Sequence, residues 1–183
     1  SLQDSMYSSG FFNNTPDDGG MIRSVPLLMK YNEVLYPSLV LEIIRIYSGA
    51  QKVEVIGDEA GVSSVNFGDF SVPTDNVGRL SVNFRGKGKY FKYISVADIL
   101  SDNFDKKEIV NKFILVGTSA VGLFDLRSIP FDSAIAGVEV HANALDNILS
   151  GDFLYKPADM ALYDLFIIWA IVIVFLLFFS FIK

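Results

Sequence analysis

Apolar and polar positions alternate with two different periods along the chain, and each period predicts a different element. Between residues 39 and 47 the apolar residues recur every three or four positions, so one side of a predicted helix carries Leu39, Ile43, Ile46 and Tyr47. From residue 52 to residue 93 the period becomes two, and turn residues separate the apolar stretches. This alternation predicts an antiparallel meander with one buried face.

The stretch after the meander predicts a β–loop–α unit. Phe113 to Val116 is a short continuous apolar run, which is typical of a strand buried on both faces in a parallel sheet. A long loop over residues 122–136 and a helix over residues 138–149 are expected to follow. The predicted apolar stripe of that helix consists of Val138, Ala142, Leu145 and Leu149. The expected fold class is α/β, of the mixed α+β kind, with a mixed sheet, an antiparallel meander, a buried parallel strand and flanking helices.

The last stretch, from Leu165 to Ile182, is apolar all round and has no charged residue, glycine or proline. At about 1.5 Å of rise per residue, roughly 18–20 such residues cross the hydrocarbon core of a bilayer. A buried core helix is the alternative, but core helices usually keep a polar stripe. The sequence therefore predicts a transmembrane helix over residues 160–183, preceded by a polar domain over residues 1–158.

Composition excludes several classes of function. The net charge of −6 and the scattered Lys and Arg residues argue against a nucleic-acid partner. The absence of cysteine excludes disulfides and thiolate metal sites, and one histidine cannot form a multi-histidine metal site. The acidic turn over residues 13–20 lacks the spacing of an EF-hand loop. We therefore expect no metal, no cofactor and no catalytic residue in this chain.

Polar side chains of the β–loop–α unit are the candidates for a binding site, because ligands of α/β proteins favour the loops at the carboxyl ends of strands. The candidate ligand-binding residues are Thr118, Ser119, Asp125, Arg127, His141 and Asn143. Residues 117–122 suggest a phosphate loop only weakly, because the Gly-Lys-Ser/Thr ending is missing.

His141 has two interpretations. In the first, its ring serves as an acid/base group or a ligand contact together with Asp125. In the second, which we favour because a lone histidine lacks evident partners, the ring hydrogen-bonds a neighbouring loop and holds it to the helix. Ser119 with His141 and an aspartate would make a hydrolytic triad, but Ser119 has no Gly-x-Ser-x-Gly elbow around it.

Several stretches resemble the CHASE domain of type two. The resemblance is carried by Phe113-Ile-Leu-Val-Gly-Thr-Ser-Ala120, Leu123-Phe-Asp125, Pro130 and, above all, Gly137-Val-Glu-Val-His-Ala-Asn-Ala-Leu-Asp-Asn147. The middle segment of that family resembles Asp17-Asp18-Gly19 with Arg23, Val25-Pro26-Leu27 and Tyr36-Pro37-Ser38-Leu39. The motif positions Asp17, Arg23, Gly117, Pro130 and Gly137 are interpreted as structural, and Arg23 is expected to pair with Asp17 or Asp18.

The resemblance implies a location and an architecture. Domains of this family are extracytoplasmic sensors of bacterial receptors, and they precede membrane helices and a cytoplasmic cyclase, kinase or diguanylate-type module. Residues 1–158 are therefore expected on the outer side of the bacterial cell membrane, either periplasmic or extracellular. The usual first part of the family, a membrane anchor and an initial α/β segment, has no counterpart here. We thus expect the C-terminal part of the domain and the first membrane helix that follows it.

The functional hypothesis is the sensor region of a bacterial transmembrane receptor, coupled to an adenylate or guanylate cyclase or, alternatively, to a histidine kinase or other kinase. A stimulus, either a small molecule or a protein, is expected to change the packing of the loop at 117–136 against the helix at 138–149. The expected partners are the lipid bilayer and a second copy of the chain. The rivals are a membrane-anchored hydrolase that uses Ser119 or Asp125 with His141, and a docking module.

Overall fold

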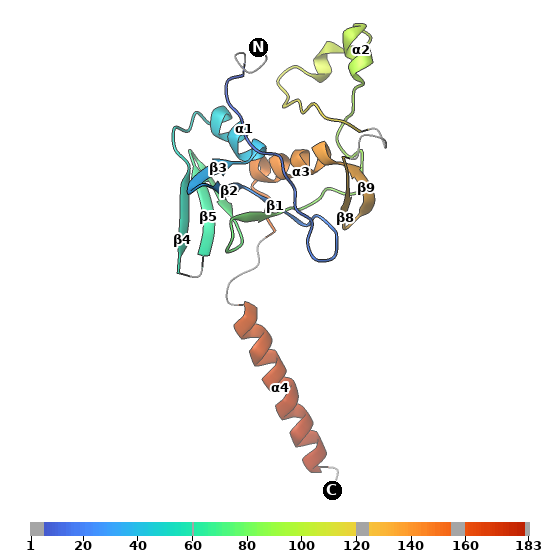
Figure 1. The fold of residues 1–183 in the computed structure, drawn as a ribbon. Helices are drawn as coiled ribbons and strands as arrows, with labels where there is room; N and C mark the ends of the chain where they lie inside the picture. The colour runs from blue at the N-terminus through green and yellow to red at the C-terminus, as the bar shows by residue number, and fades with distance from the viewer. Residues whose placement is uncertain (1–5, 60, 120–124, 155–159, 182–183) are drawn as a thin grey trace.

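The computed structural model describes residues 6–59, 61–119, 125–154 and 160–181 (Figure 1). The elements are β1 (Ser24–Pro26), β2 (Leu28–Tyr31), β3 (Val34–Pro37), α1 (Leu39–Tyr47), β4 (Glu54–Asp58), β5 (Gly61–Phe67), β6 (Phe70–Pro73), β7 (Arg79–Ser81), α2 (Val96–Leu100), the 3₁₀ helix η2 (Lys106–Glu108), β8 (Leu126–Ile129), β9 (Asp132–Ala136), α3 (Gly137–Ser150) and α4 (Met160–Phe181). The described strands form four small antiparallel sheets, β1–β7, β2–β3, β4–β5–β6 and β8–β9. The fold is thus mixed α+β.

Helix α1 and helix α3 pack against each other, and the labelled strands lie below and beside them in Figure 1. Ser38 caps α1, because its hydroxyl oxygen accepts a hydrogen bond from the Leu41 backbone N–H at 3.2 Å. The buried face of α1 consists of Val40, Leu41, Glu42 and Ile44. The predicted face was wrong: Ile46 is exposed, and Leu39 and Ile43 are half-buried. Apolar residues lie almost all around this helix, so its periodicity does not select the side that meets α3.

The predicted meander is confirmed for β4, β5 and β6, which pair in antiparallel order. The alternation at Leu80, Val82 and Phe84 also places these side chains in the core. Strand β7, however, pairs with β1 rather than with β6, so that Val25 lies opposite Leu80. The segment that follows β7 therefore runs away from the meander and towards α3.

The predicted parallel strand at 113–116 is not formed. These residues belong to no sheet, and Val116 is 83% exposed. The only parallel pairing among the described residues is an isolated bridge between Phe11 and Ser38. A strand buried on both faces needs a neighbour on each side, and the described part of the chain supplies none here.

The predicted loop at 122–136 instead contains the hairpin β8–β9, with Pro130 in its turn. Ile129 and Ile135 of this hairpin are buried in the core, each 2% exposed. Proline lacks a backbone N–H and suits a turn, so its presence between two short strands is compatible with the hairpin.

The predicted helix at 138–149 is confirmed as α3, which ends at Gly151 in the left-handed conformation with φ of 66°. Helix α4 lies apart from the other elements, and its side chains from residue 163 to residue 179 are exposed (Figure 1). The sequence predicts a membrane span at this position. Over the described residues, no helix has both the length and the apolar character that crossing a membrane requires.

Candidate functional site

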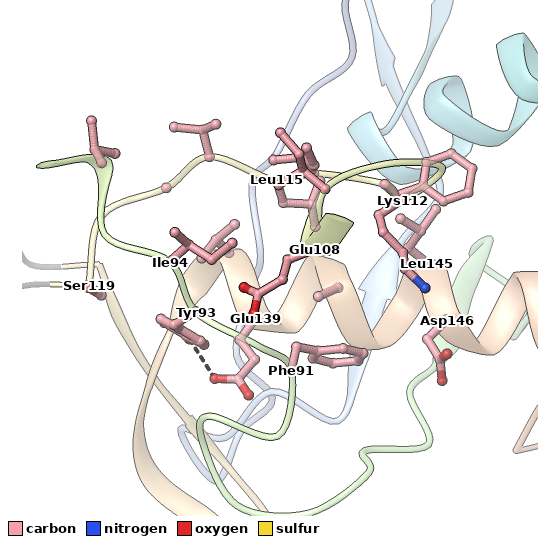
Figure 2. Close-up of a pocket in the computed structure, with 18 of the residues that line it drawn as sticks. Phe91, Tyr93, Ile94, Glu108, Lys112, Leu115, Ser119, Glu139, Leu145 and Asp146 are labelled. Atoms are coloured by element: carbon pink, nitrogen blue, oxygen red, sulfur yellow. Dashed lines mark hydrogen bonds between the residues drawn. The ribbon is translucent and has the colours of Figure 1, made fainter. Parts of the chain in front are cut away.

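A cavity of about 430 Å³ lies on the outer side of α3, beneath the segments 91–99 and 108–119 (Figure 2). The predicted apolar stripe of the helix, namely Val138, Ala142, Leu145 and Leu149, forms its floor. Leu145 of this stripe also belongs to the core, together with Val140, Ala144 and Ile148, and Leu149 packs against that core. The helix therefore has two apolar sides, one packed in the core and one facing the cavity.

The opposite wall of the cavity is the extended segment 113–117, which carries Phe113, Ile114, Leu115 and Val116. Within the described residues, no hydrogen bond reaches the backbone N–H or C=O groups of this segment. Because the segment is exposed apart from the half-buried Leu115, water can reach these backbone groups. This wall is an open edge that can accept hydrogen bonds and also donate them.

Four charged residues line the cavity, and three of them already have partners. Glu108 pairs with Lys92 at 2.5 Å, and Asp146 pairs with Arg85 at 2.6 Å. Glu139 accepts hydrogen bonds from neutral donors. Lys112 has no carboxylate or hydrogen-bond partner in the described part of the chain, and Figure 2 shows its side chain on the cavity side of the segment.

Glu139 is a site residue that the sequence reasoning did not single out. It is 3% exposed, and its carboxylate accepts hydrogen bonds from the backbone N–H groups of Lys89 and Tyr90 at 2.9 Å and from the Tyr93 hydroxyl at 2.7 Å (Figure 2). Burial, and then the neighbouring carboxylate, raise the pKa of Tyr93, so the hydroxyl stays protonated and donates. The available signal was an acidic residue in the first turn of a helix, where the helix dipole favours an anion.

Asn143 and Asn147 extend this pattern along α3 at four-residue spacing. The Asn147 side-chain amide accepts from the Asn83 N–H at 2.8 Å and donates to the Asn83 C=O at 3.0 Å. The Asn143 amide oxygen accepts from the Arg85 N–H at 3.0 Å. Side chains of α3 therefore pair with backbone groups of the segment 83–90, as a neighbouring strand would. We call these three side chains, Glu139, Asn143 and Asn147, the clamp. Asn143, a candidate ligand-binding residue, is thus already engaged in hydrogen bonds.

The structure places His141 away from the cavity. Its Nε2 lies 3.1 Å from the Phe12 carbonyl oxygen and 3.4 Å from the Asn14 side-chain nitrogen. The ring thus ties the N-terminal segment to α3, which is the arrangement of the structural interpretation. No hydrogen bond joins it to Ser119 in the described ranges, so no hydrolytic triad is assembled.

The remaining candidates divide between the cavity and the start of α3. Ser119 lines the cavity, whereas Thr118 is exposed without lining it. Asp125 pairs with Arg127 at 3.0 Å, and its backbone oxygen accepts from the Gly137 N–H at 2.8 Å.

Among the motif glycines, Gly137 has no room for a Cβ atom, because the Asp125 carboxyl group occupies that space. Gly117 is equally restricted, because a Cβ there would collide with Val138. Both glycines therefore permit close packing at the N-terminal end of α3.

Asp17 and Arg23 form the expected ion pair in the turn before β1. The Arg23 guanidinium and the backbone N–H groups of Met21 and Gly19 lower the pKa of Asp17. Pro130 lies in the β8–β9 turn, outside the cavity. The described residues contain no group of three or more His, Cys, Asp or Glu side chains that could hold a metal ion.

Burial of His141 makes the stability of the fold depend on pH. Burial lowers the pKa of His141 below its ordinary value of 6.5, and the Phe12 carbonyl and Asp125 oppose this only partly. The unfolded chain then binds the proton more readily than the folded chain. The contribution of the neutral ring to the free energy of unfolding is therefore fully present above pH 6.5 and is lost as the pH drops below that value.

We expect His141→Gln to remove this contribution. The difference in urea midpoint between the wild-type chain and the variant should shrink from about pH 7.5 to about pH 5. A difference that stays constant over this range would contradict the neutral, buried state of the ring.

The comparisons with known proteins give one match. The family model of the CHASE2 domain matches residues 3–181, which is nearly the whole chain. No curated protein and no solved structure matches the sequence. The matched range contains the cavity, its floor on α3 and the clamp on the segment 83–90.

Proposed function

Since the chain belongs to the CHASE2 domain family, whose members are extracytoplasmic sensory domains of signalling receptors, we propose that it is the sensor region of a bacterial transmembrane receptor. The proposed output module is an adenylate or guanylate cyclase, because such modules are frequent in receptors with this kind of domain. A histidine kinase or other kinase is the alternative output. The stimulus acts at the cavity on α3.

The observation that carries this proposal is the connection between the cavity and the C-terminal end of α3. Asp146 lines the cavity and pairs with Arg85, and Arg85 also pairs with Asp152, which is the first residue after the Gly151 cap. An occupant that moves Asp146 therefore also acts on the segment that leads to α4. The occupant must bind two arrangements of this region with different affinity in order to shift the balance between them.

The proposed environment of α4 is the lipid bilayer. Its exposed side chains include Phe166, Trp169 and Phe175, and the apolar run of the sequence continues to Ile182. An apolar surface of this size is not stable in water unless a partner or lipid covers it. We propose that residues 1–158 lie on the outer side of the membrane and that two copies of the chain form the receptor dimer.

Cysteine labelling tests the membrane arrangement, because the chain has no cysteine of its own. Asp69 lies in the exposed turn between β5 and β6, and Lys183 follows the apolar run. In intact spheroplasts we expect an impermeant maleimide to label Asp69→Cys fully and Lys183→Cys only after permeabilisation. Labelling of both positions from outside would overturn the receptor proposal, whatever binds in the cavity.

A further inference from the structure

His141 joins the N-terminal segment to α3, and the chemistry of this contact points to a form of regulation. Residues 8–15, which we call the strap, cross the packed helices α1 and α3. We propose that protonation of His141 opens the contact between the strap and α3 without unfolding the domain, so that acid in the surrounding medium regulates it. This inference rests on the proposed sensory function, in which residues 1–158 face the outside of the cell.

The middle of the strap is bound to both helices through backbone groups. The Phe11 N–H donates to the Pro37 C=O at 3.1 Å, and the Phe11 C=O accepts from the Leu39 N–H at 2.7 Å. The next residue places its carbonyl oxygen 3.1 Å from His141 Nε2 on α3, and the dark-blue N-terminal segment of Figure 1 accordingly passes α1 and then α3. Because Phe11 and Phe12 are adjacent, movement of Phe12 away from His141 also loosens the bridge at Phe11.

The two ends of the strap have separate attachments. The Ser8 hydroxyl donates to the Glu42 carboxylate at 2.5 Å, and the Thr15 C=O accepts from the Arg79 guanidinium at 3.0 Å. Neither attachment involves His141. The proposed opening is therefore local to residues 11–14, and the strap stays tethered on both sides of it.

The strap contributes little to the hydrophobic core. None of the side chains of residues 8–15 is buried, and Phe12 is 70% exposed. The Asn14 Oδ1 atom is shielded from water and has no hydrogen-bond partner among the described residues, so opening lets water pair with it. Segments with few buried apolar contacts open at a lower free energy than the whole domain. The strap is thus able to open by itself.

The position of the hydrogen on the neutral His141 ring follows from its partner. The Phe12 carbonyl can only accept, so Nε2 carries the hydrogen and donates it, and a second proton must enter at Nδ1. The ring is 9% exposed in the closed arrangement. Protonation therefore places a positive charge in a site that is largely shielded from water, which is unfavourable.

The charged groups around His141 do not compensate for this burial. Asp125 favours the protonated ring, but Arg127 opposes it, and these two side chains are paired with each other at 3.0 Å. The strap has no charged residue, and Glu139 on α3 itself is bound to residues 89–93. Burial is the largest effect and lowers the pKa of His141, while the hydrogen bond to Phe12 opposes it only in part.

The direction of the pH effect follows from these contacts. In the open arrangement water reaches the ring, so its pKa returns to the ordinary value of 6.5, whereas the pKa of the closed arrangement is lower. The closed strap is therefore favoured fully above pH 6.5 and loses stability as the pH falls below that value. Because one proton is involved, the ratio of closed to open molecules falls by at most about thirtyfold between about pH 7.5 and about pH 5.

Hydrogen exchange of the whole chain in lipid nanodiscs, followed by NMR, tests the proposal. The Phe11 and Leu39 amides report on the strap, and the Val82 amide, which donates to the Arg23 C=O in the core, reports on global unfolding. We expect lower protection at Phe11 and Leu39 than at Val82, with little dependence on low concentrations of urea. After correction for intrinsic exchange, protection at these two amides should fall about tenfold from about pH 7.5 to about pH 5.

His141→Gln is the matched variant, because a glutamine amide can donate to the Phe12 carbonyl but does not titrate. We expect protection at Phe11 and Leu39 in this variant to be independent of pH over the same range. The wild-type chain gives a second measurement, since its single histidine yields one ring signal after selective ¹⁵N labelling. That signal should show the Nε2–H tautomer at about pH 7.5 and should titrate together with the exchange at Phe11.

Three outcomes would overturn the inference. Protection at Phe11 and Leu39 that does not change with pH in the wild-type chain would remove the acid response. An equal fall in His141→Gln would assign the response to another group. Exchange at Phe11 with the same protection and urea dependence as at Val82 would mean that the strap opens only when the domain unfolds. The labelling result at Asp69 and Lys183 is independent of all three, so the sensory proposal can stand if this inference fails.

Discussion

Replacing Asn147 with alanine is expected to lower the free energy of unfolding by about 3 kcal/mol. The Asn147 side chain is fully buried, and its amide pairs with both the N–H and the C=O of Asn83, at 2.8 and 3.0 Å. Alanine replaces neither bond, and each backbone group left unpaired in a buried interface costs about 1–3 kcal/mol. Urea unfolding followed by circular dichroism measures the loss.

Asn66→Ala is the matched control for this prediction. The Asn66 side chain also makes a hydrogen bond, which it accepts from the Ser71 hydroxyl at 2.8 Å, but this bond lies on the exposed side of β5. Water can replace it, so we expect a change within about 0.5 kcal/mol. Similar losses for Asn147→Ala and Asn66→Ala would show that the segment 83–90 does not depend on the clamp from α3.

The clamp also shows why local patterns reveal only part of this fold. The alternation at Leu80, Val82 and Phe84 correctly predicted which side chains are buried, because a half-buried strand needs only its own period. The clamp joins Asn83 to Asn147, far apart in the sequence, through side chains that periodicity treats as ordinary polar positions on a helix. Only the folded arrangement brings the two segments together.

Helix α3 and the segment at 113–116 illustrate two further limits. The spacing of apolar residues and Gly151 predicted the helix correctly. Periodicity does not tell which of its two apolar sides packs in the core and which faces the cavity. The apolar run from Phe113 to Val116 has the composition of a buried strand, yet a strand also needs a neighbour with which to exchange hydrogen bonds. The same run therefore forms one wall of the cavity, and of the six candidate ligand-binding residues only Ser119 lines that cavity.

In the proposed receptor, Arg85→Gln is expected to uncouple the cavity from the output module. Arg85 donates to Asp146 at 2.6 Å and to Asp152, and hydrogen bonds from Arg85 lower the pKa of Asp152, so the pair stays charged at neutral pH. Glutamine cannot reach both carboxylates with paired donors. A stimulus that changes the cavity then no longer acts on the residues beyond Gly151.

A double-substitution experiment measures this coupling through cyclic-nucleotide production, the output of the proposed cyclase module. Ala142→Phe fills the cavity from its floor and should change production about five- to tenfold, which is a usual coupling strength between two sites. In the Arg85→Gln background, Ala142→Phe should have little effect, because the connection to Asp152 is broken. Arg23→Gln is the control, since it breaks an exposed ion pair with Asp17 that is remote from the cavity. An undiminished effect of Ala142→Phe in the Arg85→Gln receptor would place the signal path elsewhere, and a receptor that makes no cyclic nucleotide would rule out the cyclase as its output.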